Sequence, residues 1–393
     1  MPYKSFFSAL LLTLLLSLTA CGGSNPDNKS SSPPKARGTL IADKYIDSTK
    51  ANRLLYLTYS VKAYKISYSS IGPNGETVTA SGLLAIPQKK PNKKSPLLSY
   101  QHGTRFKDEN RPSNNTDGLM QLAAQGYIVS APDYLGYGDS LSNGHPYIHA
   151  DSYANSAIDM LRATKAFLKR SKTPINKQLF LAGYSEGGYA TLALQKAIQE
   201  SYSDEFKVTA SAAGAGPYNI SETATFMFKK AENEKPAFMN FVIKSYNDTY
   251  QLGLINEMYQ PQYVDAINTV FDGLHSSGEI NKALTTKTAE LFKAKFLSTM
   301  QNSGKHILKE KLVKNNIYNW KPIAPTLLFH SKYDEVVPYF NSEDAYNAMQ
   351  DRGTQNISFE KCNLNRLGSH VKCAAIYLRK AKFFFDNYNP ELN

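Results

Sequence analysis

The run Gly183-Tyr184-Ser185-Glu186-Gly187 places a serine between two glycines in the spacing G-x-S-x-G. In such an elbow the serine hydroxyl is exposed between a strand and a helix, and side chains at Gly183 or Gly187 would collide with those neighbours. A serine hydroxyl is a weak nucleophile at neutral pH, so it needs an imidazole base that a carboxylate orients. The sequence therefore predicts Ser185 as the nucleophile of an acyl transfer. The alternative is a glycine-rich turn whose serine has no catalytic role.

The chain order of the partners, an acid and then a histidine after the serine, selects the base. His370 follows the last predicted strand, in Leu-Gly-Ser-His at the start of the final predicted helix. Other histidines precede Ser185 or fall in a predicted helical insertion (His102, His145, His149, His275, His306). We predict His370 as the general base, with an exposed loop histidine as the alternative. The acid is expected after the strand at 326–330, where Asp334 and Glu335 are adjacent candidates.

Acyl transfer also needs two backbone N–H groups that bind the oxyanion of the tetrahedral intermediate. One expected donor is the N–H of Glu186, the residue after the nucleophile. The second is expected from the loop that follows Gln101, in His102-Gly103-Thr104.

Metal, cofactor and nucleic-acid chemistry have little support in the sequence. His145 and His149 are four residues apart, a spacing that can bind a metal on a helix, but Pro146 lies between them and no third ligand is evident. No metal and no cofactor are expected. The net charge of +12 favours anionic surfaces such as lipid headgroups or nucleic acid. Because the lysines are scattered, as in the pairs Lys89-Lys90 and Lys93-Lys94, we expect no nucleic-acid binding.

Strands and helices must alternate to position these residues. Two β-rich runs, 62–71 and 77–86, flank Gly72-Pro-Asn-Gly75, a turn that predicts an antiparallel hairpin. Beyond it, short apolar runs alternate with longer helical patterns, which indicates βαβ units and a mostly parallel sheet. The expected strands are 97–101, 127–132, 179–183, 208–215, 325–330 and 357–360, and the expected helices are 118–124, 152–169, 188–198 and 371–385.

The alternation stops between residues 218 and 320, where only helical patterns occur. We interpret 218–320 as a helical cap, or lid, inserted into a core that consists of 39–217 and 321–393. Its aromatic residues are candidates for the floor of an acyl pocket or for the interior of the cap (Phe226, Phe228, Phe238, Phe241).

The N-terminus has the pattern of an export signal, because Lys4 precedes an uncharged apolar run at 6–18. That run is too short to span a membrane comfortably as a mature helix. It ends in Leu-Thr-Ala-Cys21, which resembles a bacterial lipobox, so we expect a lipoprotein signal peptide at 1–20 and a lipidated Cys21. Two or three acyl chains make a firm membrane anchor. The polar stretch 21–38 is expected to be a flexible tether, and an ordinary signal peptide is the alternative.

The two other cysteines, Cys362 and Cys373, form an even pair if Cys21 carries lipid. In an oxidising compartment such a pair predicts a disulfide. Two unpaired buried thiols are the alternative, because the sequence does not show how far apart they lie.

Several motifs together resemble the secretory lipase branch of the α/β-hydrolases. They are Ala131-Pro-Asp-Tyr-Leu-Gly-Tyr-Gly-Asp-Ser140, His145-Pro-Tyr-Ile-His-Ala-Asp151, the Ser185 elbow and the long insertion before Asp334. The resemblance covers about residues 60–387. It implies an α/β-hydrolase fold, a helical lid over the acyl site, and the activity of an extracellular lipase or carboxylesterase.

The resemblance also bears on the acid and on the second oxyanion donor. Asp-x-Val-Val-Pro resembles the acid loop of the family and favours Asp334 over Glu335. His102-Gly103-Thr104 resembles its His-Gly oxyanion loop, which assigns the second donor to Thr104, with Gly103 as the alternative. His102 would then shape the loop.

Three further residues are expected to support the pocket. Asp133 and Tyr134 would lie beside the nucleophile, where they line or brace the pocket; packing of the sheet edge is the alternative. Tyr184, next to the nucleophile, is the third of these expected residues.

The leading hypothesis is a hydrolase that cleaves an ester or lipid-like small molecule through an acyl-enzyme on Ser185. A serine exopeptidase is the second hypothesis, because Gly-Tyr-Ser-x-Gly-Gly also occurs in serine peptidases of this fold. An exopeptidase would need a carboxylate near the pocket to bind the substrate ammonium. Glu186 is not evidence for such a carboxylate, because its position follows from the elbow itself. A non-catalytic surface-binding lipoprotein is the third hypothesis. The acyl chain length, the alcohol and any movement of the cap stay open.

We expect a monomer that is exported and anchored to the bacterial envelope or the cell surface through Cys21. Gly22 is not aspartate, which in a diderm bacterium favours sorting to the outer membrane.

Overall fold

The structure, a computed structural model, describes residues 36–52, 57–364 and 369–389. The predicted signal peptide and Cys21 lie outside these residues. The described chain forms a nine-stranded sheet in the order β1-β2-β3-β5-β4-β6-β7-β8-β9. Its strands are β1 (Leu40–Thr49), β2 (Val61–Ile71), β3 (Thr77–Pro87), β4 (Ser95–Gln101), β5 (Ile128–Pro132), β6 (Ile175–Tyr184), β7 (Ala210–Gly214), β8 (Thr326–Ser331) and β9 (Ile357–Cys362).

The N-terminal strands are antiparallel and the rest of the sheet is parallel. β2 and β3 pair along their whole length, from Val61 opposite Pro87 to Ile71 opposite Thr77. The turn between them contains Gly75 at a φ of 88°, which residues with a side chain rarely adopt. From β5 to β9, neighbouring strands pair in parallel. The predicted fold class, a mostly parallel sheet with an N-terminal antiparallel hairpin, is confirmed.

Helices pack on both faces of the sheet. One face is covered by α1 (Asp117–Ala124) and α13 (Ser369–Asp386), and the other by α2 (Ala150–Arg170), α3 (Glu186–Ser201) and α12 (Phe340–Asp351). The central strands are therefore buried on both sides, which explains their nearly continuous apolar runs. Because parallel strands end at a common edge, the residues that follow β4, β6 and β8 meet there.

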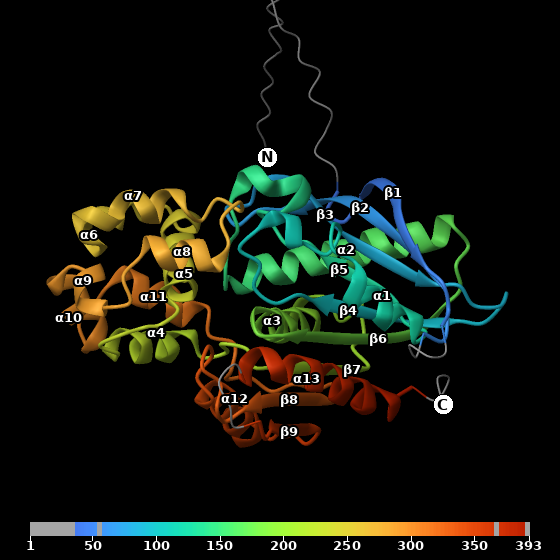
Figure 1. Cartoon of the computed structure of the whole chain (residues 1–393). Coiled ribbons are helices and arrows are strands. Elements are labelled where there is room, and N and C mark those ends of the chain that lie inside the picture. The colour runs from blue at the N-terminus through green and yellow to red at the C-terminus, as the bar shows by residue number, and fades with distance from the viewer. Residues whose placement is uncertain (1–35, 53–56, 365–368, 390–393) are drawn as a thin grey trace, which may run out of the picture. The chain divides into compact units, whose positions relative to one another are not determined.

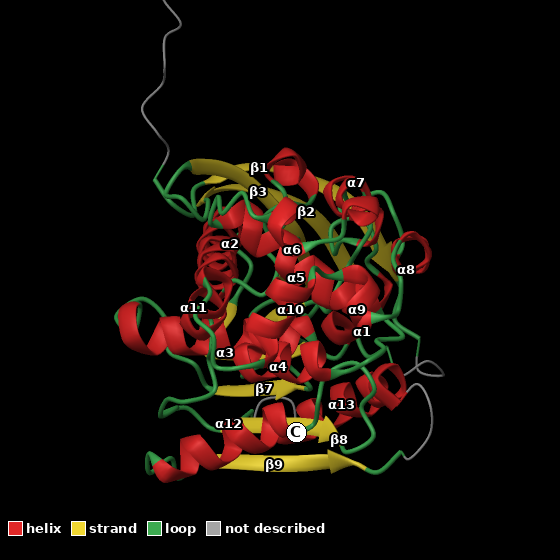
Figure 2. Ribbon diagram, turned by 90° about the vertical axis from the view of Figure 1, so that its left-hand side faces the viewer, coloured by secondary structure: helices red, strands yellow, loops and turns green. Residues whose placement is uncertain are grey.

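The segment between β7 and β8 consists mainly of short helices, which we call the cap: α4 (Ile220–Lys229), α5 (Pro236–Thr249), α6 (Ile255–Met258), α7 (Pro261–Thr269), α8 (Ser277–Ala283), α9 (Thr288–Leu291), α10 (Ala294–Gln301) and α11 (Ile307–Lys314). These helices gather on the left of the sheet in Figure 1 and lie in front of it in Figure 2. Their apolar side chains form one cluster with residues of α2 and α3. The treatment of 218–320 as a separate domain stays a prediction.

Two elements were not predicted. β1 is mostly exposed, so its sequence lacks an apolar alternation, and α12 buries only part of one face. Hydrogen bonds to the core also begin before residue 39, the predicted start of the core. Arg37 donates hydrogen bonds to Asp159, Tyr202 and Asn155. Among the helices that the structure describes, none combines the length and the apolar character that a membrane crossing requires.

Candidate active site

Ser185 lies in the turn between β6 and α3. Its φ of 62° and ψ of −125° form a conformation that residues with a side chain seldom adopt, and its N–H donates to the carbonyl of Gly214 at 2.8 Å. A Cβ at Gly183 would strike the carbonyl of Gly187, and one at Gly187 would strike the carbonyl of Gln101. The two glycines are therefore required by the tightness of the turn.

Three side chains from distant segments form a continuous hydrogen-bonded chain. The Oγ of Ser185 is 2.9 Å from Nε2 of His370, and Nδ1 of His370 is 2.6 Å from Oδ2 of Asp334. A ring that donates through Nδ1 to the carboxylate accepts the serine hydroxyl at Nε2. This arrangement can transfer a proton from the serine to the imidazole.

The side chain of Asp334 is fully buried, and both of its carboxylate oxygens are hydrogen bonded. Its Oδ1 accepts the N–H groups of Val336 and Val337 at 2.9 and 2.8 Å, and its Oδ2 faces a second histidine, His330, at 3.2 Å. Burial alone would raise the pKa of the carboxyl group. The hydrogen bonds and charges of His330 and His370 outweigh burial and lower the pKa well below its ordinary value. Asp334 therefore stays ionised beside the imidazole.

His330, in β8, is a residue of the site that was not predicted from the sequence. It is completely buried, and its Nε2 also lies 3.1 Å from the carbonyl of Val337. Because this nitrogen faces two acceptors, it carries a proton. Nδ1 lies 2.8 Å from the Oγ of Ser342 on α12. A histidine four residues before the acid, at the end of the strand, was the signal available in the sequence.

Glu335, the rival acid, contacts the backbone of the base rather than its ring. Its Oε2 lies 3.3 Å from the N–H of His370 and 3.3 Å from the Oγ of Ser369. Its Oε1 pairs with Lys235 at the start of α5, at 3.3 Å. The imidazole ring of His370 therefore bonds to Asp334 and not to Glu335.

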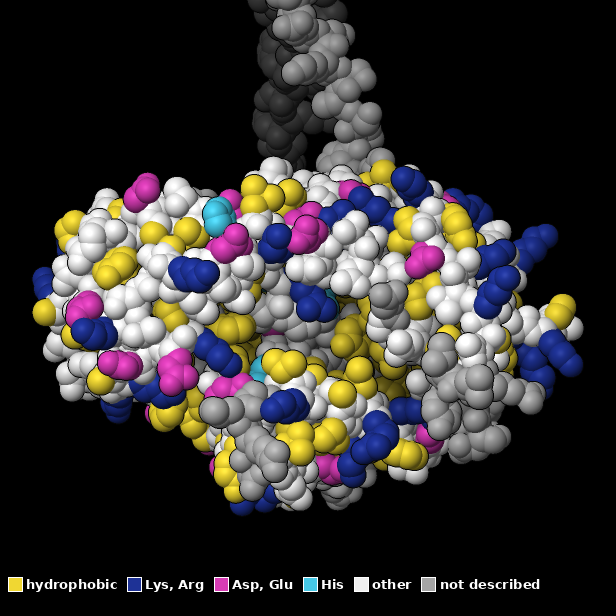
Figure 3. Space-filling view, viewed as in Figure 1, with side chains coloured by type: hydrophobic (Ala, Val, Ile, Leu, Met, Phe, Trp, Pro, Cys, Tyr) yellow, Lys and Arg dark blue, Asp and Glu magenta, His cyan; other side chains and the backbone are white. Residues whose placement is uncertain are grey.

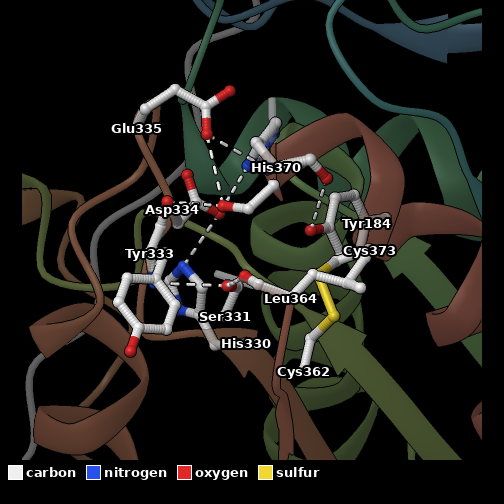
Figure 4. The surroundings of a disulfide bond; sticks show 11 residues. Tyr184, His330, Ser331, Tyr333, Asp334, Glu335, Cys362, Leu364, His370 and Cys373 are labelled. Atoms are coloured by element: carbon white, nitrogen blue, oxygen red, sulfur yellow. Dashed lines mark hydrogen bonds and ion pairs between the residues drawn. A yellow bond between two sulfur atoms is a disulfide. The ribbon is translucent and has the colours of Figure 1, made fainter. Parts of the chain in front are cut away.

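The first turn of α13, which carries His370, is held from two sides (Figure 4). Cys362 at the end of β9 forms a disulfide with Cys373, with Cα atoms 6.1 Å apart. The hydroxyl of Tyr184 donates to the carbonyl of His370 at 2.8 Å. Tyr184 thus contacts the helix that carries His370 and does not line the cavity beside Ser185.

The residues of the predicted oxyanion site lie together. Glu186 is the first residue of α3, where the backbone N–H has no partner within the helix. Gly103 packs against the elbow, since a Cβ there would lie 3.1 Å from the carbonyl of Tyr184 and 3.7 Å from Cβ of Ser185. The side chain of Thr104 shares a 2.8 Å hydrogen bond with the hydroxyl of Tyr147. The choice of Thr104 over Gly103 as donor stays a prediction.

His102 spans the oxyanion loop and the segment after β5. Its ring nitrogens lie 2.8 Å from the carbonyl of Gly103 and 3.1 Å from that of Asp133. The ring stacks on Tyr134 with centroids 4.0 Å apart, and the Tyr134 hydroxyl donates to the carbonyl of His102. Burial lowers the pKa of His102 to about 4.

Asp133 braces the same region. Its carboxylate accepts hydrogen bonds from the hydroxyl of Ser81 at 2.6 Å and from the N–H and hydroxyl of Ser113 at 2.8 and 2.6 Å. Neither Asp133 nor Tyr134 lines the cavity above Ser185.

The Glu186 side chain was predicted only as a neighbour of the nucleophile, but it takes part in a buried polar cluster. Its Oε1 lies 3.0 Å from Nε2 of His145 and accepts the hydroxyl of Tyr153 at 2.8 Å. Burial raises the pKa of this carboxyl group, whereas the hydrogen bond and charge of His145 lower it, and the net result is a pKa below the ordinary value.

A small apolar cavity of about 50 Å³ adjoins Ser185. On the face shown in Figure 3, the surface is hollowed between the cap and the core, and hydrophobic side chains line the hollow. The cavity is lined by Tyr147, Ile148, Ser185, Glu186, Pro217, Ile220, Thr223, Met227, Phe238, Met239, Val242, Val336 and Val337. A larger groove between α3 and the start of β8 contains none of the residues described above.

The four aromatic residues singled out in the insertion have different surroundings. Phe238 lines the cavity, Phe228 and Phe241 are buried in the cap, and Phe226 is 39% exposed. Within the described ranges, no group of three or more His, Cys, Asp or Glu side chains is arranged to hold a metal ion. Nδ1 of His149 faces Ser152 instead, at 2.8 Å.

Comparisons with known proteins agree with one another. Residues 114–377 match the secretory lipase family. A secreted triacylglycerol lipase of Malassezia globosa is 27% identical over 290 residues, which cover 70% of this chain and 58% of that lipase. The chain thus spans less than two thirds of that relative.

Solved structures share the fold. The rice cell wall degrading esterase LipA of Xanthomonas oryzae is 27% identical, with a TM-score of 0.81 over 88% of this chain and 98% of that chain. Candida antarctica lipase A in its closed state has a TM-score of 0.67 at 18% identity, over 90% of this chain and 83% of that chain, and shows a common fold. Since the family match extends over more than half of the sequence, the chain belongs to the secretory lipase family.

Proposed function

We propose that the protein hydrolyses carboxylic esters through an acyl-enzyme on Ser185. The observation that carries the proposal is the hydrogen-bonded chain from Ser185 through His370 to Asp334 beside an apolar cavity. Ser185 Oγ attacks the ester carbonyl while Nε2 of His370 takes its proton, and Asp334 stabilises the imidazolium. His370 then returns the proton to the leaving alcohol. In the second half of the reaction, His370 activates a water molecule that releases the acid and restores Ser185.

The developing oxyanion would be bound by the N–H of Glu186 and by that of Thr104, with Gly103 as the alternative. Two features support this proposal: Glu186 begins α3, and the loop at 102–104 packs against the elbow. Each such donor accounts for a few kcal/mol of barrier lowering.

The substrate we propose is an ester with an apolar acyl group. Support comes from the aliphatic and aromatic residues that α4 and α5 contribute to the cavity, and from a family that includes secreted triacylglycerol lipases. An exopeptidase has less support, since Glu186 is the sole acidic residue among the described lining residues and its carboxylate faces His145 and Tyr153.

We also propose that the enzyme is exported and held on a membrane by lipid on Cys21, as a monomer. Residues 1–20 would be removed, and the remainder of 21–38 would tether the core of 39–217 and 321–393 with its cap at 218–320. The charge-free apolar run before Cys21 supports export. Intact-mass analysis of the membrane-extracted protein tests this part: a diacylglycerol-modified chain that begins at Cys21 supports it, and an unmodified chain that begins elsewhere overturns it.

The activity is tested by the turnover of p-nitrophenyl esters of graded chain length against that of aminoacyl anilides. We expect the esters to be turned over and the anilides to be turned over little. Ester turnover should be lost in Ser185→Ala but kept in Ser203→Ala, which changes an exposed serine outside the site. Preferential cleavage of the anilides would contradict an esterase.

A further inference from the structure

The carboxylate of Glu186 poses an electrostatic problem for the proposed oxyanion site. The backbone N–H of this residue is a proposed oxyanion donor, while its side chain is a fully buried acid. A negative charge so close to a developing oxyanion opposes it, and burial strengthens the repulsion because little water screens it. The site therefore requires compensation of this charge.

His145 is arranged to provide the compensation. Its Nδ1 lies 2.7 Å from the carbonyl of Leu135, an atom that can only accept, so Nδ1 carries a proton. Its Nε2 lies 3.0 Å from Oε1 of Glu186. When a proton lies between Nε2 and Oε1, the two side chains together are uncharged, whichever of them holds it. The lowered pKa of Glu186 favours an ionised carboxylate.

The surroundings hold this pair in place. The side chains of His145 and Glu186 are 3% and 0% exposed, so neither can exchange its partner for water at low cost. The Tyr153 hydroxyl donates to the same carboxylate oxygen, and the rings of Tyr137 and Phe241 pack against His145 at 4.7 and 5.7 Å.

The segment that carries His145 also contacts the second half of the oxyanion site and the cap. The Tyr147 hydroxyl bonds to Thr104 in the oxyanion loop. The hydroxyl of Ser245 on α5 donates to the carbonyl of His145 and accepts the N–H of Tyr147. Residues 145–147 therefore connect both proposed donors with the cap.

On the basis of the proposed esterase function, we propose that His145 is a positioning residue whose Nε2 shares a proton with the carboxylate of Glu186, offsets its charge and so keeps the oxyanion site able to stabilise negative charge. It touches neither the substrate nor the reacting atoms. Its effect should appear in the chemical step rather than in substrate binding.

A double-mutant cycle separates this role from a structural one. His145→Phe keeps an aromatic ring but leaves the carboxylate uncompensated, so kcat for p-nitrophenyl butyrate should fall by about 30- to 100-fold with little change in KM. Glu186→Gln alone should lower kcat by less than His145→Phe does, because it removes the charge together with its need for compensation. The double variant His145→Phe/Glu186→Gln should recover at least about tenfold over His145→Phe, since it removes the charge that needed compensation. Rates are normalised by active-site titration with a fluorophosphonate, so that misfolded protein does not count.

The matched control is His149→Asn, a buried histidine four residues along the chain that contacts neither Glu186 nor the oxyanion loop, and it should stay within about threefold of wild type. If His145→Phe does not fold, His145→Gln is used in the same cycle with the same expected rescue. Losses that multiply in the double variant, or a normal kcat in the single one, would overturn the role of His145. Absence of ester turnover in the wild type would instead overturn the proposed function.

Discussion

The two sides of the proposed active site are held by different interactions. The base side, residues 330–337 and 369–373, joins titratable side chains directly: two histidines share Asp334, and a disulfide pins the helix that carries His370. The proposed oxyanion side, residues 102–104, 145–147 and 185–187, relies on backbone N–H groups. Its side chains, including the titratable pair His145 and Glu186, stack and hydrogen bond around the segments that would supply these groups. Single substitutions should therefore act directly on the chemistry of the base side and only indirectly on the oxyanion side.

The largest effect is expected from the acid of the base side. Asp334→Asn should lower kcat by about 10³- to 10⁴-fold, because the amide no longer stabilises the imidazolium in the required tautomer. The neighbouring Glu335→Gln is the matched control and should cost less than about tenfold, because this residue bonds to the backbone of His370 and to a partly exposed lysine. Ester turnover of the two variants measures the difference, and a greater loss in Glu335→Gln would reverse the assignment.

Two buried histidines, His330 on the base side and His102 on the oxyanion side, test whether the two sides are held differently. His330→Phe removes a hydrogen bond to the charged Asp334 and should lower kcat by about 10- to 100-fold. His102→Phe removes hydrogen bonds to neutral carbonyls while keeping the ring over Tyr134, so we expect a loss of about tenfold or less. Equal losses in active-site-titrated kcat would mean that the two sides are not held differently.

Loss of the disulfide should weaken the base side. The bond joins residues 11 apart in the sequence, so Cys362→Ser/Cys373→Ser should lower the free energy of unfolding by about 2–3 kcal/mol. Denaturant unfolding of wild type, of the variant and of the variant with reductant measures this. An unchanged midpoint in the variant, or a further shift when reductant is added to it, would be inconsistent with this bond as the cause.

The smallest effect concerns acid stability. The folded-state pKa of Asp334 lies below its ordinary value near 4, so its carboxylate stabilises the fold above about pH 4 and this contribution is lost as the pH falls further. Between pH 7 and pH 3, wild type should lose about 1 kcal/mol more unfolding free energy than Asp334→Asn. Parallel pH dependences of the two proteins would show that the pKa of Asp334 is not depressed.

The sheet was predictable because its signals are local. The hairpin has a turn sequence at Gly72–Gly75, and the buried strands have continuous apolar runs. β1 and α12 were missed because their burial depends on neighbours rather than on their own patterns. Helical patterns in the cap likewise do not show the isolated bridge of Tyr259 with Phe292.

The residues of the candidate site also divide into those that local signals predict and those whose partners meet only in the folded chain. The sequence alone selects Ser185 and His370, because the elbow and the chain order of the partners are fixed by the fold. The structure brings these two side chains together, and their catalytic roles stay predictions. His330 and His145 were not selected, since a buried histidine gains its role from partners that meet it only in three dimensions. Asp133 and Tyr134 were expected to line or brace the pocket; their side chains hydrogen bond to the adjoining loops and do not line the cavity.

The central claim is that Ser185 carries the acyl group. The most direct measurement is mass spectrometry of the protein after rapid acid quenching during turnover of a slowly deacylated p-nitrophenyl ester, with peptide mapping of the adduct. Our account predicts one acyl group on the peptide that contains Ser185, and none in Ser185→Ala. Ester turnover with an adduct on another residue, or undiminished turnover in Ser185→Ala, would contradict it.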